Sequence, residues 1–256
     1  MALNQKITDW QNKVVWISGA SSGIGVSLAE VLLQRGAKVI LSARHVENLA
    51  EFCLRYANAQ AWTCDICDAP SLALTLQRII KQHQRIDLFI ANAGVYQAMR
   101  AFEFDPPAAR QMLDINVRGT IDSVACVIPQ LVQQGTGGIA LVASVAGYVG
   151  LPNALIYGAS KAALINFSET LYLDLSARGI NVTLINPGFV ETRLTSTNKF
   201  YMPALLTSEQ AAQKIIDGFA RGDFEIHFPK RFTLWLKLLR LLPYRAYFYL
   251  VKRATQ

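Results

Sequence analysis

The sequence contains little cysteine and histidine, and this scarcity excludes two kinds of site. It has four cysteines and three histidines in 256 residues. Four cysteines are too few for a disulfide scaffold and are typical of a reducing compartment. Cys64 and Cys67 have the spacing of half a zinc site, but no second cysteine pair is present to complete it. We therefore expect a cytoplasmic protein that binds no metal.

Charged residues are also scarce, and long apolar runs are missing. Only 17% of the residues are charged, and none of these lies between Ser123 and Ser160. Prolines, glutamines and glycines interrupt this uncharged stretch, so no apolar run reaches the ~20 residues that a membrane span needs. We interpret the stretch as the interior of a sheet. The first residues, Met1 to Lys13, are polar and lack the apolar core of a secretion signal.

Acidic residues are absent from the end of the chain, because none follows Glu225. This final segment carries seven basic residues, namely Lys230, Arg231, Lys237, Arg240, Arg245, Lys252 and Arg253. The other 18 basic residues balance the 18 acidic ones, so the net charge of +7 belongs to the tail alone. The body of the chain has no basic surplus, and we expect no nucleic-acid partner. We assign residues 1–228 to one domain and residues 229–256 to a basic C-terminal extension.

Buried strands alternate with helices along most of the chain. Short, largely apolar runs that fit buried strands occupy residues 14–18, 38–42, 60–64, 87–91, 139–142 and 182–186. Helical patterns follow Gly25 and cover residues 46–56, 70–83, 107–133 and 154–178. This alternation predicts an α/β fold of the Rossmann type, a doubly wound parallel sheet with helices on both faces. With 52% hydrophobic residues, the chain can bury a sizeable core.

A glycine-rich turn, Gly19-Ala-Ser-Ser-Gly23-Ile-Gly25, follows the first strand and opens the first helix. Free backbone amides and the positive end of the helix dipole favour a phosphate at such a place. Glycine allows the backbone to turn sharply and to approach a ligand closely. The spacing differs from the commoner Gly-x-Gly-x-x-Gly pattern, but its position between a strand and a helix favours a dinucleotide.

The second strand ends in an arginine where NAD-binding sites usually have a carboxylate. About twenty residues beyond the glycines, an acidic side chain commonly binds the ribose hydroxyl of NAD. Here the strand ends in Leu41-Ser42-Ala43-Arg44, and no carboxylate is present. A guanidinium suits the 2′-phosphate of NADP because it carries a permanent charge and several donors. We therefore expect NADP(H) with Arg44 at the phosphate, and a solvated loop arginine is the alternative.

Tyr157 and Lys161 lie four residues apart in a helical stretch, so they project from one face of that helix. The phenol of tyrosine has a reference pKa of about 10, and a fixed cation nearby lowers it. Such a pair can give or take a proton at a carbonyl or alcohol oxygen. For an isolated pair, a surface lysine beside a half-buried tyrosine is the common alternative, so the other motifs must decide.

Together these motifs resemble the short-chain dehydrogenase/reductase family, in its shorter, single-domain branch. They occur in the family's order and at its approximate spacings, over roughly residues 12 to 228. The matching motifs are Ser18 to Gly25, Asn92-Ala93-Gly94, Asn116, Ser144, Tyr157-Gly-Ala-Ser-Lys161, and Pro187-Gly188 with Thr192. The first residue of the glycine motif is often threonine in the family, and Ser18 keeps the hydroxyl.

The resemblance implies a role for each matching residue. Tyr157 would protonate the substrate oxygen as hydride arrives from the nicotinamide, and Lys161 would lower the Tyr157 pKa and bond the nicotinamide ribose. Ser144 would hydrogen-bond the substrate carbonyl, and Asn116 would hold a water that links Lys161 to solvent. Asp65 and Ile66 match positions that contact adenine. The implied cofactor-binding residues are Gly19, Ser21, Ser22, Gly23, Ile24, Gly25, Arg44, Asp65, Ile66, Asn92, Ala93, Gly94, Tyr157, Lys161, Pro187, Gly188, Val190 and Thr192.

The resemblance leaves the substrate open. A variable segment over residues 190–206 would cover it and contributes the apolar side chains of Phe200, Tyr201, Met202, Leu205 and Leu206. We therefore expect an apolar pocket and a small lipophilic carbonyl or alcohol substrate, and a homodimer or homotetramer. A catalytically inactive scaffold or regulatory nucleotide-binding protein is the alternative, although such proteins often lose the tyrosine or the lysine and both are present here.

The basic tail has the pattern of an amphipathic helix. At 100° per residue, one stripe holds Lys230, Thr233, Lys237 and Arg240, and leucine and aromatic side chains spread over the other side. Pro243 ends this helix. Basic residues beside leucine and aromatic side chains are typical of a helix that lies in a membrane interface. Peripheral membrane contact through residues 230–253 is therefore one prediction, and a helix packed on its own domain or across a dimer is the other.

Overall fold

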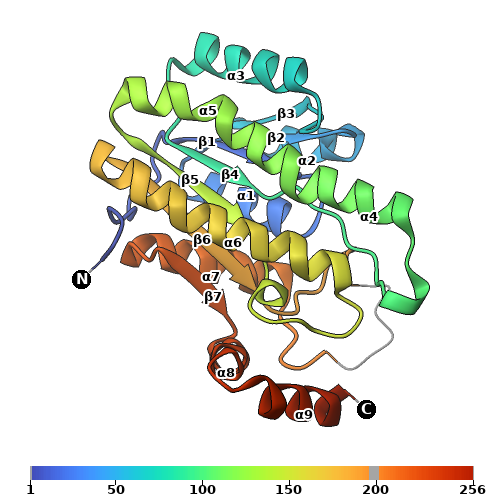
Figure 1. Cartoon of the computed structure of the whole chain (residues 1–256). Helices are drawn as coiled ribbons and strands as arrows, with labels where there is room; N and C mark the ends of the chain where they lie inside the picture. The colour runs from blue at the N-terminus through green and yellow to red at the C-terminus, as the bar shows by residue number, and fades with distance from the viewer. Residues whose placement is uncertain (1, 196–201, 256) are drawn as a thin grey trace.

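Within residues 2–195 and 202–255, which the computed structural model describes, seven parallel strands form one central sheet (Figure 1). Their order across the sheet is β3-β2-β1-β4-β5-β6-β7. The strands are β1 (Val14–Ser18), β2 (Lys38–Ala43), β3 (Ala59–Thr63), β4 (Leu88–Ala91), β5 (Gly137–Val142), β6 (Ile180–Pro187) and β7 (Glu225–Phe228). This arrangement confirms the predicted doubly wound, Rossmann-type α/β sheet.

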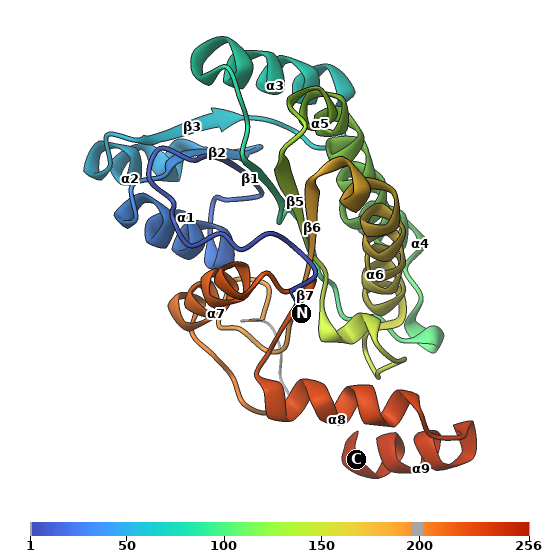
Figure 2. The same cartoon turned by 90° about the vertical axis from the view of Figure 1, so that its left-hand side faces the viewer.

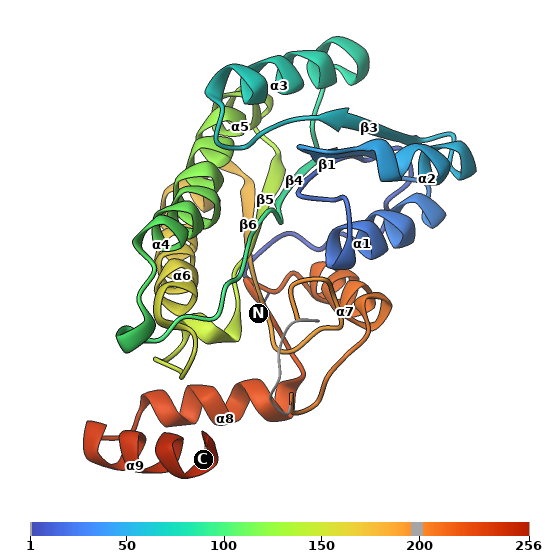
Figure 3. The same ribbon diagram turned by 90° about the vertical axis from the view of Figure 1, so that its right-hand side faces the viewer.

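Helices cover both faces of the sheet (Figures 2 and 3). The helices on the two faces are α1 (Gly23–Gln34), α2 (Ala50–Arg55), α3 (Ala69–His83), α4 (Pro106–Leu113), α5 (Thr120–Gln134), α6 (Leu155–Leu175) and α7 (Ser208–Arg221), and the tail adds α8 (Lys230–Arg240) and α9 (Tyr244–Thr255). On one face, Leu32 of α1 and Phe219 of α7 belong to the same buried cluster. On the other face, Ile79 of α3, Val124 of α5 and Leu175 of α6 share a second cluster. The strands between them are buried on both sides, which explains their continuous apolar runs.

The six strands predicted from sequence are all present, with ends within two residues of the predicted ones. The predicted helix over residues 46–56 is interrupted, because a 3-10 turn (Glu47–Leu49) precedes α2. Neither α7 nor β7 was predicted. A readable signal marked α7, since Thr207 Oγ1 accepts from Gln210 N and Thr207 N donates to Gln210 Oε1, which is a capping box.

The predicted helix over residues 107–133 is two helices joined by a π-helical segment. This segment, Asp114–Gly119, lies between α4 and α5. Insertions of this kind are rare and occur frequently at functional sites. Asn116 lies inside the segment and is fully buried. The break in helical geometry therefore positions a side chain that the sequence placed in the middle of a regular helix.

The tail forms two helices beyond the β7 edge of the sheet (Figure 2). Helix α8 begins directly after Pro229, and α9 folds back beneath it (Figures 2 and 3). Leu236 of α8 is 5% exposed and packs in a buried cluster with Val145, Leu164 and Leu184. Among the described residues, no helix is long and apolar enough to cross a bilayer.

Two members of the predicted polar stripe of α8, Thr233 and Lys237, face the protein, whereas Lys230 and Arg240 are exposed. Thr233 is fully buried and hydrogen-bonds to the ring of His227, and Lys237 forms an ion pair with Glu225. Several leucines of the predicted apolar side, including Leu238, are exposed instead. The buried side of α8 thus contains both polar and apolar residues. The reason is that β7 supplies polar partners, Glu225 and His227, to Lys237 and Thr233.

We expect Leu236→Ala to lower the free energy of unfolding by about 2–4 kcal/mol, because it leaves a cavity where α8 meets the core. Leu238→Ala is the matched control, since Leu238 is 50% exposed on the same helix. The control should change the stability by less than about 0.5 kcal/mol. Urea unfolding followed by circular dichroism measures both variants. Equal losses would show that α8 does not dock through the Leu236 face.

Candidate active site

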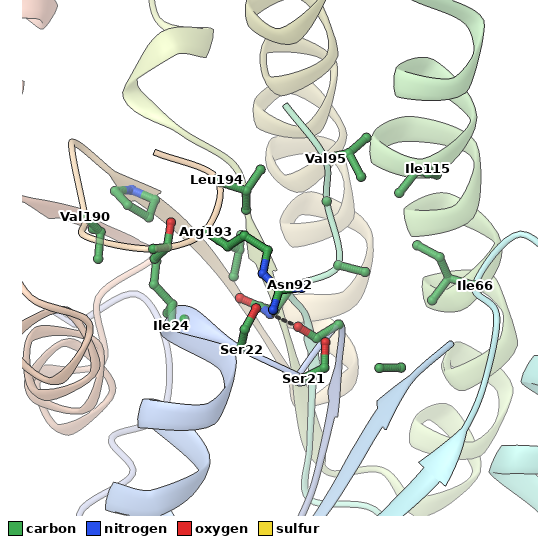
Figure 4. A pocket seen from close by; sticks show the side chains of 18 of the residues that line it. Ser21, Ser22, Ile24, Ile66, Asn92, Val95, Ile115, Val190, Arg193 and Leu194 are labelled. Atoms are coloured by element: carbon green, nitrogen blue, oxygen red, sulfur yellow. Dashed lines mark hydrogen bonds between the residues drawn. The ribbon is translucent and has the colours of Figure 1, made fainter. Parts of the chain in front are cut away.

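A cavity of about 360 Å³ opens at the carboxyl end of the strands (Figure 4). It lies where β1 has β2 on one side and β4 on the other, so that the chain order reverses. Open α/β sheets bind ligands at such a point. The sequence-predicted site residues all line the cavity except Gly25 and Asn116. In Figure 4, Ser21 and Ser22 lie near its centre, between Ile24 and Val190 on one side and Ile66, Val95 and Ile115 on the other.

The glycine turn lies so close to the end of β4 that no side chain fits between them. Gly19 has a φ of +65°, and a Cβ on it would lie 2.3 Å from Ala93 Cα. Asn92 Nδ2 donates to the carbonyl oxygens of Gly19 (2.8 Å) and Ser18 (3.3 Å). Ser18 Oγ in turn accepts from Asn92 N at 3.3 Å. These bonds hold the turn at the mouth of the cavity.

The first amides of α1 face this cavity without a side-chain cap. Ser22 is the N-cap residue, and its side chain makes no capping hydrogen bond among the described residues. Uncapped amides at a helix start are ready donors for a phosphate. Gly25 lies behind them, where a Cβ would be 2.7 Å from Asn92 Nδ2. Gly25 therefore permits close packing of the turn, and the structure does not bring it to the cavity wall.

Asn116 also lies behind the wall, where it joins two parts of the site. Its Oδ1 accepts from Val95 N (2.8 Å), and its Nδ2 donates to Val95 O (2.9 Å) and to Ser160 Oγ (3.1 Å). A Cβ on Gly94 would lie 3.3 Å from Asn116 Oδ1 and 3.4 Å from Lys161 Nζ. Asn116 thus ties the segment after β4 to α6, next to Lys161. The water expected at Asn116 stays a prediction.

Helix α6 directs Tyr157 and Lys161 toward the cavity from one face, as their spacing predicts. Lys161 is only 4% exposed, and its Nζ donates to Val142 O at 2.9 Å. The same Nζ lies 5.7 Å from the centre of the Tyr157 ring. Tyr96 packs edge-to-face against that ring, with 5.0 Å between the ring centres. The Tyr157 phenol and the Lys161 ammonium therefore lie on the same side of the cavity, where little water reaches them.

Burial governs the pKa of Tyr157 in the described structure, and the lowering of that pKa by Lys161 stays a prediction. Burial raises the pKa of Tyr157, and a hydrogen bond from Ser144 offsets only part of that effect. The same burial lowers the pKa of Lys161 to about 8. The physical reason is that both groups lose water, while the ammonium is directed at the Val142 carbonyl. The Tyr157 phenol therefore keeps its proton at neutral pH.

Ser144 follows β5 and is held by the turn that it caps. Its Oγ accepts from Ala146 N at 3.1 Å, at the start of a 3-10 turn over Val145–Gly147. Because the oxygen accepts this bond, the hydroxyl proton can be donated into the cavity. Ser144 thus stands as a donor beside the Tyr157 phenol.

The far end of the cavity is lined by Arg44, His45 and Asn48. His45 and Asn48 were not predicted, although His45 directly follows Arg44 in the sequence. Asp65 and Ile66 line the same region, as the family resemblance implies. Among the described residues, no cluster of Cys, His, Asp or Glu could hold a metal ion.

The segment between β6 and α7 forms the remaining wall. Its predicted members Pro187, Gly188, Val190 and Thr192 all line the cavity, and so do Arg193 and Leu194, which were not predicted. In Figure 4 the Arg193 side chain extends toward Asn92, across the glycine turn. Its position directly after Thr192 was the only sequence signal for it.

Part of the apolar substrate cover expected over residues 190–206 lies outside the described residues. Phe200 and Tyr201 lie outside the described residues. Met202, Leu205 and Leu206 are described but do not line the cavity. The apolar lining that the structure places there comes instead from residues such as Val190 and Leu194.

A partly buried polar network connects the tail to the segment that follows Ser144. Tyr148 Oη donates to Glu225 Oε1, and Asn186 Nδ2 donates to the same oxygen at 2.8 Å. Lys237 of α8 pairs with Glu225 Oε2. Burial opposes ionisation of Glu225, but hydrogen bonds from Lys237, Tyr148 and Asn186 outweigh it and lower the pKa of this carboxyl. Burial, with the bond to Glu225, raises the pKa of Tyr148.

Comparison with known proteins finds similar sequences and similar folds. Residues 13–200 match the family model for short chain dehydrogenase. An uncharacterized oxidoreductase of Myxococcus xanthus is 34% identical over 231 residues, which cover 89% of this chain and 91% of that protein. A Burkholderia cenocepacia short chain dehydrogenase solved with NADP has a TM-score of 0.84 at 24% identity, covering 95% of this chain and 99% of that one. A Burkholderia phymatum short chain dehydrogenase/reductase solved with NAD has a TM-score of 0.83 at 24% identity, covering 91% and 94%.

We expect Lys161→Met to raise the free energy of unfolding at pH 7 by about 1–3 kcal/mol, because burial lowers the Lys161 pKa from 10.5 to about 8. Below pH 8 the Lys161 side chain is protonated in both the folded and the unfolded state, so the free-energy cost of burying its charge does not change with pH. Between pH 8 and 10.5 the lysine is protonated only in the unfolded state, so the stability of the native protein rises with pH. The difference in stability between the variant and the native protein therefore shrinks. Urea titrations at pH 7 and pH 10 test both parts. A variant less stable than the native protein at pH 7 would contradict the argument.

Proposed function

The chain belongs to the short-chain dehydrogenase/reductase family of oxidoreductases, and on this premise we propose that it transfers hydride between NADP(H) and a carbonyl or alcohol group of a small lipophilic substrate. The observation that carries the proposal is the meeting of Tyr157, Lys161 and Ser144 in the wall of the cavity that the glycine turn also lines. The complete set favours an enzyme over an inactive scaffold. Assembly as a homodimer or homotetramer and a cytoplasmic location stay predictions.

The cavity has the features that a nicotinamide dinucleotide needs. The close approach of Gly19 to Ala93 and the uncapped amides at the start of α1 suit the pyrophosphate. Arg44 would bind the 2′-phosphate of the adenosine ribose, and Asp65 and Ile66 would lie beside the adenine. When bound, the nicotinamide would supply or accept the hydride.

In this proposal the protein's own groups handle the proton and the substrate oxygen. In reduction, the Tyr157 phenol donates its proton to the carbonyl oxygen, while Ser144 donates a hydrogen bond that stabilises the developing negative charge. Lys161 then stabilises the phenolate that Tyr157 leaves behind. Because burial raises the Tyr157 pKa, the phenol is protonated at neutral pH and ready to act as an acid. Alcohol oxidation needs the phenolate and should therefore gain from higher pH.

Tyr157→Phe is expected to lower the turnover number by about 10²–10⁴-fold, because only the transferable proton is removed. The dissociation constant for NADPH should change little. Steady-state kinetics with a soluble ketone, together with NADPH fluorescence titration, measures the two quantities separately. Near-native turnover in this variant would refute the assignment of Tyr157. Loss of NADPH binding would show instead that the phenol supports the site structurally.

Cofactor choice in this proposal depends on Arg44. Solved relatives were crystallised with NAD in one case and NADP in another, so the fold alone does not select between them. Arg44 lines the end of the cavity next to His45 and Asn48, and β2 offers no carboxylate to a ribose hydroxyl. A guanidinium there favours a phosphate through charge and paired donors.

Arg44→Ala is expected to lower the ratio of kcat/KM for NADPH to kcat/KM for NADH by about 10–100-fold, as loss of a charged hydrogen bond predicts. Arg193→Ala is the matched control, since Arg193 lies across the glycine turn near the part shared by both cofactors. The control should lower kcat/KM for NADPH and for NADH to a similar degree. A native protein that prefers NADH would overturn the assignment of Arg44.

A further inference from the structure

Helix α8 presents a row of large apolar side chains to solvent. Leu234, Trp235, Leu238 and Leu241 are all exposed, with 65% of Trp235 and 79% of Leu241 accessible. Their spacing places them on one face of the helix. The opposite face is occupied, because Leu236 packs in the core and Thr233 is fully buried. The exposed row is therefore a fixed surface, since the helix cannot rotate to bury it.

Helix α9 adds aromatic and basic side chains beside this row. Tyr244, Phe248 and Tyr249 are exposed, and so are Arg245, Lys252 and Arg253 of this helix and Arg231 of α8. We call these residues, with the exposed row of α8, the tail surface. No acidic residue follows Glu225, and that carboxylate is already bound by Lys237, Tyr148 and Asn186. The tail surface thus combines apolar, aromatic and positive groups with no carboxylate of its own.

We infer that the tail surface docks on an anionic lipid bilayer. Leucine, tryptophan and tyrosine side chains enter the boundary between headgroups and acyl chains, and lysine and arginine bind anionic headgroups. Eleven residues of α8 make a helix far shorter than a bilayer is thick, so the helix lies along the surface. The docking surface is preformed, because polar bonds on the inner face of α8 already fix its orientation.

A second copy of the chain is a poorer occupant than a lipid surface. In a two-fold interface the same patch meets itself, so the basic residues of one tail would face those of the other. No carboxylate on either patch would compensate for the repulsion. An anionic bilayer satisfies both the apolar row and the surrounding charge, and it is therefore the partner that this surface fits.

Docking would also bring the lipid next to the active-site cavity. Phe232 of α8 packs on Phe189 with 5.7 Å between ring centres, and a Cβ on Gly188 would lie 3.2 Å from the Phe232 ring. Gly188 lines the cavity. On the other side, Tyr247 of α9 hydrogen-bonds to Gly150 O, in the segment that follows Ser144. A lipophilic substrate would then enter from the bilayer, a step that rests on the proposed function, whereas docking itself does not.

The test uses the full chain and two kinds of vesicle, one of phosphatidylcholine alone and one that also contains phosphatidylglycerol. We expect co-sedimentation with the anionic vesicles that is at least about tenfold stronger than with neutral ones and that weakens with salt. Leu238→Glu and Arg245→Glu should each reduce it about tenfold or more. Leu54→Glu on α2 and Arg78→Glu on α3 are matched controls, because both residues are exposed far from the tail (Figure 1), and they should bind as the native protein does.

Other outcomes would overturn docking on an anionic bilayer. Absence of binding to either vesicle by well-behaved native protein would do so, and so would equal binding to both. An oligomer that Leu238→Glu dissociates, with no vesicle binding, would show that a second copy covers the surface.

The activity measurements separate this inference from the proposed function. Leu238→Glu should keep its NADPH-dependent activity on a soluble ketone and lose activity on a long-chain ketone carried in anionic vesicles. Equal activity on both would refute entry from the bilayer.

Discussion

The contact between the glycine turn and the end of β4 is the constraint on which the rest of the site depends. Gly19 and Ala93 approach so closely that a single added carbon would overlap the Ala93 backbone. Asn92 then donates hydrogen bonds to the carbonyl oxygens of Ser18 and Gly19. With the two strand ends fixed in this way, α1 begins at one defined place, and its free amides line the cavity. A looser contact between Gly19 and Ala93 would leave the positions of the other cavity-lining residues relative to the turn undefined.

The position of the tail is set by polar pairing together with apolar packing. Glu225 receives hydrogen bonds from three side chains, and one of them, Lys237, comes from α8. His227 accepts from Lys230 at Nε2 and pairs with Thr233 at Nδ1, and burial lowers its pKa to about 4, so it is neutral at physiological pH. These bonds fix the rotation of α8, and through Tyr148 they also reach the segment that carries Ser144. The tail and the active site are therefore parts of one bonded structure.

Sequence patterns predicted the strands and most of the site because these depend on local signals. A strand buried on both faces must be apolar throughout, and the glycine turn is required by local backbone geometry. The rotation of α8 could not be predicted in this way, because the partners of Thr233 and Lys237 lie on β7, a short strand without a clear pattern. The effect of burial on the Tyr157 pKa was also out of reach, since only the packed structure defines that burial. Arg193 was missed because its role depends on how the chain folds back over the turn.

The buried ammonium of Lys161 bears on how this sequence has been maintained over time. The structure accepts a positive charge in a place with one carbonyl partner and almost no water. A neutral side chain of similar size would suit that place better, and one or two nucleotide changes would supply it. A lineage that no longer used its active site would be expected to drift toward such replacements, because most of them remove a standing cost to folding. In the proposed function, this standing cost to folding is the counterpart of the role that Lys161 would have in the chemistry.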